Sequence, residues 1–147
     1  MDLAMLPIIV YCVRWGLGPG LISGLAYGLL QILSGEEGFL IGWQSILGDY
    51  LLAYTVMGFG GLFRGKFYPA AILACVLRFL VHYVVGATIW AQWMPETFFG
   101  MTMTTPWFYS ALYNGAYMLP DLLVVLVVGA LLMRTPVKKY LLAKDLQ

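Results

Sequence analysis

Residues 69–93, PAAILACVLRFLVHYVVGATIWAQW, decide the fold class of this chain. The stretch is longer than the ~20 apolar residues that a helix needs to cross a bilayer. Its only basic side chains are Arg78 and His82, whose spacing places them on one face of a helix. Because an ionisable group in hydrocarbon is unfavourable unless it is paired or hydrated, both residues indicate either a partner or a site.

The composition of the whole chain indicates a membrane protein. Of its 147 residues, 62% are hydrophobic and only 10% are charged, whereas a soluble domain has about 25% charged residues. So few charges could not cover a surface exposed to water. The formal net charge of +1 gives no indication of nucleic acid. We expect an all-α membrane protein with a single domain over residues 1–147.

Five apolar segments follow one another along the chain. We predict five membrane helices and no strand, at residues 3–13, 21–33, 46–63, 69–93 and 108–133. The first segment is too short to span a bilayer alone at about 1.5 Å per residue. It is joined tightly to the second through RWGLGPG, residues 14–20.

The joints between the segments alternate in charge. The basic joints carry Arg14, Arg64 and Lys66, and the chain after the last segment carries Arg134, Lys138, Lys139 and Lys144. The other joints carry Glu36, Glu37 and Glu96. Since basic joints face the cytoplasm, we predict five passes with the N-terminus outside and the C-terminus inside. Trp43, Trp90, Trp93 and Trp107 then lie at the outer interface, as an aromatic belt or as part of a ligand site.

Small residues form a second pattern. Glycine recurs at positions 16, 20, 24 and 28, which makes a smooth stripe on a helix. Such a stripe lets helix backbones approach closely in lipid. We interpret it as packing within one chain, with a docking face for another subunit as the alternative. The GFGG stretch at residues 58–61 is expected to pack in a similar way.

Catalytic, metal and cofactor chemistry find little support in the sequence. Cys12 and Cys75 both lie in apolar runs, so we expect buried thiols and neither a disulfide nor a metal site. With one histidine, no activated nucleophile and no phosphate-binding loop, the chain is not expected to be an enzyme or to hold a cofactor.

The polar residues inside the segments suggest a ligand site. In the predicted topology the outer half of the membrane receives such residues from three helices: Asp49, Tyr50, His82, Trp90, Tyr109 and Asn114. A carboxylate with amide, phenol and broad aromatic groups suits a flat aromatic ligand with ring nitrogens and positive charge. The alternative for His82 is a core histidine bonded to a neighbour. Arg78 and Asp121 are expected deeper, as a structural ion pair between two helices.

At these residues the chain resembles a known family. The stretches MLPIIVYCVRWGLGPGLISGLAYGLLQ, LGDYLLAYTVMGFGGLF, RFLVHYVVGATIW and YSALYNGAYMLP resemble the thiamine-specific S component of energy-coupling-factor (ECF) vitamin transporters, the ThiT/YuaJ family. The resemblance runs in order from Met5 to Leu132. It implies an S-component helical bundle of usually six helices, five of them here. It also implies thiamine as the ligand, bound from outside in a bacterial plasma membrane.

The resemblance also implies partners and residue roles. The partners would be a shared transmembrane subunit and two cytoplasmic ATPase subunits that use the ATP. Asp49 would bind the aminopyrimidine with Tyr50 beside it, and Trp90 would stack on the ligand. His82, Tyr109 and Asn114 match the family's remaining ligand positions.

The family pattern includes a first helix and a first loop ahead of the matched stretch, and that loop supplies a tryptophan that closes the site. This chain starts after both, so we expect a site that is open on one side. Three rival functions remain at this point: an S component for another vitamin or precursor, a small membrane enzyme built on Asp49 and His82, and a scaffold that uses the glycine stripe.

Overall fold

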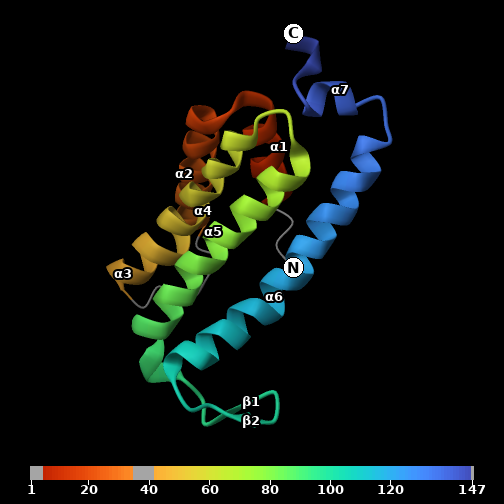
Figure 1. Ribbon diagram of the computed structural model, residues 1–147. Helices are drawn as coiled ribbons and strands as arrows, with labels where there is room; N and C mark the ends of the chain where they lie inside the picture. Colours follow the sequence, from red (N-terminus) through yellow and green to blue (C-terminus); the bar gives the residue numbers. More distant parts are fainter. Residues whose placement is uncertain (1–4, 35–41, 147) are drawn as a thin grey trace.

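A computed structural model describes residues 5–34 and 42–146, which form a bundle of apolar helices with a short hairpin at one end (Figure 1). The long elements are α1 (Met5–Trp15), α2 (Leu17–Ser34), α5 (Phe67–Thr88) and α6 (Pro106–Met133). A composite rod lies between α2 and α5. It consists of α3 (Trp43–Ser45), the π-helix η1 (Ile46–Leu52), α4 (Ala53–Met57) and the 3-10 helix η2 (Gly58–Phe63).

A helix forms in each of the five predicted segments; residues 3 and 4 of the first segment lie outside the described residues. Four helical stretches are long and apolar enough to cross a membrane: Leu17–Ser34, Trp43–Phe63, Phe67–Thr88 and Pro106–Met133. The 11 residues of α1 make it the shorter fifth helix, as its sequence predicted. The one-residue joint between α1 and α2 is Gly16, whose φ of 88° is accessible to glycine without steric strain.

The prediction of no strand was wrong. After the short 3-10 turn η3 (Ala91–Trp93), β1 (Thr97–Phe98) and β2 (Met101–Thr102) pair antiparallel, with Thr97 opposite Thr102. A turn at Phe99 and Gly100 connects them, and both residues have positive φ. The sequence offers only one glycine between two short stretches as a sign of this hairpin. A search for apolar runs as long as a membrane span does not detect so short a feature.

The glycine stripe packs within the chain, as interpreted from the sequence. Gly20, Gly24 and Gly28 are the buried residues of α2. A Cβ at Gly28 would lie 2.7 Å from the carbonyl oxygen of Tyr50, and one at Gly20 would lie 2.9 Å from that of Gly58. The backbones of α2 and the composite rod are therefore in direct contact along this stripe.

The basic joints lie together at one end of the bundle, where α1 ends and α7 (Lys138–Leu141) begins (Figure 1). Arg14 makes two hydrogen bonds of 2.8 Å to Asp145 in the 3-10 turn η4 (Lys144–Leu146), and it also donates to the carbonyl oxygen of Tyr140. The hydrogen bonds from Arg14 hold the pKa of Asp145 below its ordinary value. The C-terminal segment is thereby fastened to the end of α1.

The apolar core fills the half of the bundle nearest this basic end. Its fully buried members include Met5, Ile9, Val13, Met57 and Ala74. Cys12 and Cys75 are buried free thiols in the same cluster, as predicted. Along α5 the buried residues change from apolar to charged at Arg78, so the polar half of the bundle begins there.

Candidate ligand-binding site

A cavity of about 790 Å³ occupies the polar half of the bundle. The helices α2, α5 and α6, the composite rod and the turn after α5 all contribute to its walls. The lining residues are Gln31, Ser45, Asp49, Tyr50, Tyr54, Arg78, His82, Gly86, Trp90, Trp93, Tyr109, Ser110, Tyr113, Asn114, Tyr117 and Asp121. The structure thus brings together all six predicted ligand residues, and Arg78 and Asp121 line the same cavity.

The carboxylate of Asp49 is the centre of a hydrogen-bond network that crosses the cavity wall. Its Oδ1 lies 2.9 Å from Nδ1 of His82, and its Oδ2 accepts from Nε1 of Trp90 at 2.8 Å. Ser45 donates a third hydrogen bond to Oδ2 at 3.2 Å. Asp49 lies in the π-helix η1, a type of turn that is frequent at functional sites. One carboxylate therefore orients a histidine and a tryptophan on another part of the chain.

One ring nitrogen of His82 is hydrogen-bonded, and the other has no hydrogen-bond partner among the described residues. An ionised carboxylate can only accept, so Nδ1 of His82 carries the proton and donates to Asp49. The other nitrogen, Nε2, is buried and has no hydrogen-bond partner among the described residues. A neutral imidazole that donates from Nδ1 has an acceptor at Nε2, and a buried polar atom left unsatisfied is unfavourable until another group pairs with it.

Trp90 reaches this network because α5 ends before it, which the sequence did not predict. The helix stops at Thr88 rather than continuing to residue 93, and Trp90 adopts φ −90° and ψ 0° outside it. This turn directs the indole back toward the composite rod, where its N–H meets Asp49. Trp93 packs against Trp90 with ring centroids 5.4 Å apart.

Asn114 connects α5 and α6 beside the cavity. Its Nδ2 donates to the carbonyl oxygens of Ser110 at 2.9 Å and His82 at 3.3 Å, while its Oδ1 accepts from the hydroxyl of Tyr117 at 2.8 Å. The two helices come this close because of Gly86, where a Cβ would lie 3.3 Å from Nδ2 of Asn114. In this structure Asn114 fixes the helix pair, and its contact with a ligand remains a prediction.

Two tyrosines of α6 that were not predicted from the sequence also line the cavity. Tyr113 and Tyr117 follow Tyr109 at intervals of four residues along α6, so the three rings form one stripe. Neighbouring rings lie 5.7 and 5.8 Å apart, and the ring of Tyr117 lies 6.5 Å from that of His82. The spacing in YSALYNGAY was visible in the sequence and is the signal that could have identified them.

Arg78 and Asp121 lie at the inner end of the cavity lining. They are 5% and 3% exposed. The guanidinium of Arg78 donates to the hydroxyl of Tyr54 at 3.1 Å and lies 4.5 Å from the centroid of the same ring. Their predicted ion pair stays a prediction.

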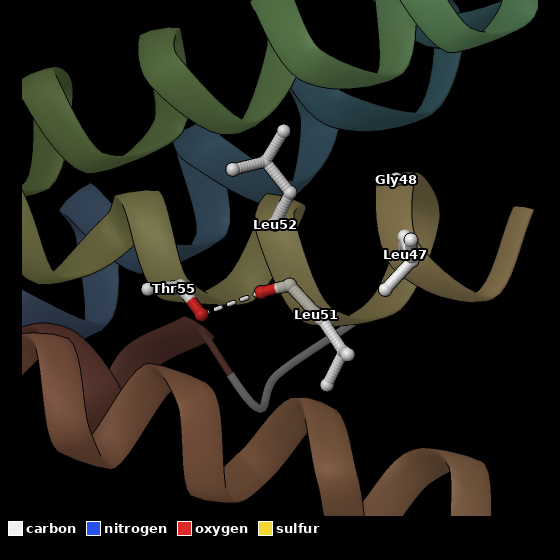
Figure 2. A pocket seen from close by; sticks show the side chains of 5 residues that line it. All are labelled: Leu47, Gly48, Leu51, Leu52 and Thr55. Carbon is white, nitrogen blue, oxygen red and sulfur yellow. Dashed lines mark hydrogen bonds between the residues drawn. The ribbon is translucent and has the colours of Figure 1, made fainter. Parts of the chain in front are cut away.

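A second hollow has a different character. It is a shallow groove of about 470 Å³ on the composite rod, lined by Leu47, Gly48, Leu51, Leu52 and Thr55 (Figure 2). Its one hydroxyl, on Thr55, donates to the carbonyl oxygen of Leu51. With apolar walls and that hydroxyl engaged, the groove offers no polar group to orient a ligand.

The large cavity is equipped for binding rather than bond making. Both serine hydroxyls of the cavity lining already make hydrogen bonds: Ser45 donates to Asp49, and Ser110 donates to the carbonyl oxygen of Tyr83. Neither hydroxyl is bonded to His82, so the Asp49–His82 pair activates neither serine as a nucleophile. The fold and the cavity define a multi-pass membrane protein with a polar, aromatic-walled cavity inside its helical bundle.

Comparison with known proteins identifies the family. The model of the thiamine transporter protein family (Thia_YuaJ) matches residues 1–141, and the chain belongs to this family. It is 29% identical to the thiamine transporter ThiT of Bacillus subtilis (strain 168), over 92% of this chain and 75% of that protein. It is 27% identical to the thiamine transporter ThiT of Lacticaseibacillus paracasei, over 99% of this chain and 78% of that protein.

A solved structure shares the fold. ThiT from Listeria monocytogenes superimposes with a TM-score of 0.81 at 24% identity, covering 95% of this chain and 81% of that one. The resemblance stated from the sequence is thus confirmed, and so is the S-component-like helical bundle. The relatives are named transporters, which agrees with the expectation that the chain is not an enzyme.

Proposed function

We propose that this protein captures thiamine from outside the cell in the cavity around Asp49 and His82. The observation that carries the proposal is Nε2 of His82, which is buried and has no hydrogen-bond partner among the described residues, while Asp49 holds the opposite nitrogen. The aminopyrimidine of thiamine carries an amino group that can donate to such an acceptor. Membership of the thiamine transporter family supports the same ligand.

The remaining walls suit the other features of thiamine. Its thiazolium ring is a cation, and the negative charge of Asp49 together with the aromatic faces around the cavity favours a cation. A cation over an aromatic face contributes about 0.5–2 kcal/mol, the larger value applying once water is excluded. Trp90 and Tyr109 supply such faces, and Tyr50 and Asn114 supply polar groups nearby.

The transport step belongs to a larger assembly in this proposal. The chain acts as the S component of an ECF transporter in the bacterial plasma membrane. A transmembrane subunit and two cytoplasmic ATPase subunits are its partners, and they use the ATP. The gathering of basic residues at the end with α7 supports a cytoplasmic C-terminus and a cavity toward the outside.

The experiment for the ligand is a binding panel on the purified protein in detergent. Thiamine, riboflavin and biotin are titrated while tryptophan fluorescence is recorded, because Trp90 lies in the cavity wall. We expect saturable quenching by thiamine alone. Saturation by riboflavin or biotin in place of thiamine would instead support an S component for another vitamin.

The experiment for the assembly is uptake into vesicles. Labelled thiamine should accumulate only when the chain is reconstituted with the transmembrane subunit, both ATPases and internal ATP. Accumulation by the chain alone, without ATP, would contradict the proposed division of labour.

A further inference from the structure

A side chain of the hairpin formed by β1 and β2 contacts the cavity wall. The ring of Phe98 meets that of Tyr109 edge-on, with centroids 5.3 Å apart and an interplanar angle of 89°. It also lies 6.0 Å from the ring of Tyr113. Both tyrosines line the cavity, whereas Phe98 stands behind them and is not among the described lining residues.

The contacts continue inward from the hairpin. Tyr109, Tyr113 and Tyr117 touch in sequence along α6, and Tyr117 meets the ring of His82. Ring contacts thus lead from Phe98 to the Asp49–His82 pair. Tyr113 is 49% exposed, so its ring lacks the support that full burial would provide. Its ring neighbours are Phe98 of the hairpin and the tyrosines at 109 and 117.

The hairpin itself is held in an unfavourable backbone conformation. Its turn places Phe99 at φ 51° and Gly100 at φ 73°. Hairpin turns with two positive φ values favour asparagine or glycine at the first position, and a bulky residue there is strained. Such strain persists only where the surroundings fix the segment. The surroundings here are the two tyrosines against Phe98 and the hydrogen bond from Met103 N to Glu96 O, 2.9 Å.

We infer that Phe98 is a positioning residue that braces Tyr109 and Tyr113 and thereby sets how long a ligand stays in the cavity. The inference rests on the proposed function for one point, that the ligand is thiamine. Phe98 acts through the tyrosines and touches no ligand. Loss of its ring frees two walls of the site, which speeds release more than it changes the rate of encounter.

The test combines release kinetics with a ligand-free measurement. In stopped-flow displacement of thiamine, Phe98→Ala should raise the dissociation rate about tenfold, with little change in the association rate. Phe98→Tyr should restore slow release, because it keeps the aromatic ring. Thr97→Ala is the matched control. Thr97 belongs to the same strand but is exposed, and the alternation of side chains along a strand places it on the face opposite Phe98, so its change should leave release unchanged.

The ligand-free arm uses 3-fluorotyrosine at position 113 and ¹⁹F NMR. Phe98→Ala should shift and narrow this resonance, and Thr97→Ala should leave it in place. An unchanged resonance in Phe98→Ala, or equal effects of both variants on release, would overturn the brace. If the wild-type protein bound no thiamine while Phe98→Ala still moved the resonance, the proposed function would fail and the brace would stand.

Discussion

Asp49 and His82, 33 residues apart in the chain, meet at 2.9 Å between Oδ1 and Nδ1. Their side chains are only 17% and 12% exposed, so the pair lies inside the bundle. It joins the π-helix η1 to α5 and determines which nitrogen of His82 is left without a hydrogen-bond partner among the described residues. The proposed recognition of thiamine depends on this one relationship.

Asp49→Asn should weaken thiamine binding by about 10- to 100-fold, the usual effect of losing a charge-assisted hydrogen bond. The amide removes the negative charge and presents a donor where the carboxylate accepts from His82 and Trp90. Fluorescence titration measures the effect, and circular dichroism checks the fold. Asp145→Asn makes the same chemical change at the opposite end of the bundle and should leave the affinity unchanged. Equal affinities for all three proteins would remove Asp49 from the site.

Arg78 and Asp121 are expected to stabilise each other as a buried ion pair. Arg78→Met or Asp121→Leu alone should destabilise the protein by about 3–5 kcal/mol, because each leaves one buried charge uncompensated. The double variant should recover much of that loss. Thermal melting in detergent measures all four proteins, and additive losses in the double variant would argue against the pair.

Gly24→Ala should destabilise the protein by about 1–3 kcal/mol, the range for overpacked sites. A Cβ at Gly24 would overlap the carbonyl group of Tyr54 in the composite rod. Gly18→Ala is the matched control in the same helix, since a Cβ there has nothing within 4 Å. Thermal melting compares the two variants, and similar melting temperatures would show that the glycine stripe is not a tight contact.

The two ends of the bundle should lie on opposite sides of the membrane. Phe99→Cys at the hairpin tip should react with an impermeant thiol reagent added outside intact cells. Lys139→Cys in α7 should react only after the cells are opened. The native thiols, Cys12 and Cys75, are buried and give a low background. Labelling of both positions from outside would contradict the proposed topology.

Much of the fold could be predicted because hydrocarbon solvent leaves a strong pattern in sequence. Long apolar runs identified the membrane helices, and glycine at every fourth residue identified the tight face of α2. The five helices were predictable in existence, whereas the end of α5 at Thr88 was not. Gly86 stands inside the last turn and no proline or glycine follows directly after Thr88, and Trp90 leaves the helix to bond with Asp49 across the bundle.

The site was predictable where unusual residues stood in apolar runs. Asp49, His82 and Asn114 are conspicuous there, and the structure places them around one cavity. Their contacts with a ligand stay a prediction. Tyr113 and Tyr117 were missed because tyrosine is common in membrane segments, and only their spacing from Tyr109 indicates a shared face. The π-helix at η1 and the strained turn at Phe99 depend on tertiary contacts, which local sequence does not encode.

The most direct test of the account is calorimetric titration of thiamine into the wild-type protein and into His82→Asn. The asparagine amide can still donate to Asp49 from near the position of Nδ1, but it places nothing at Nε2. We predict one-to-one binding by the wild type and at least about tenfold weaker binding by the variant, as expected for the loss of one well-buried hydrogen bond. Undiminished affinity in His82→Asn, or no binding by the wild type, would contradict the assignment of this cavity to thiamine.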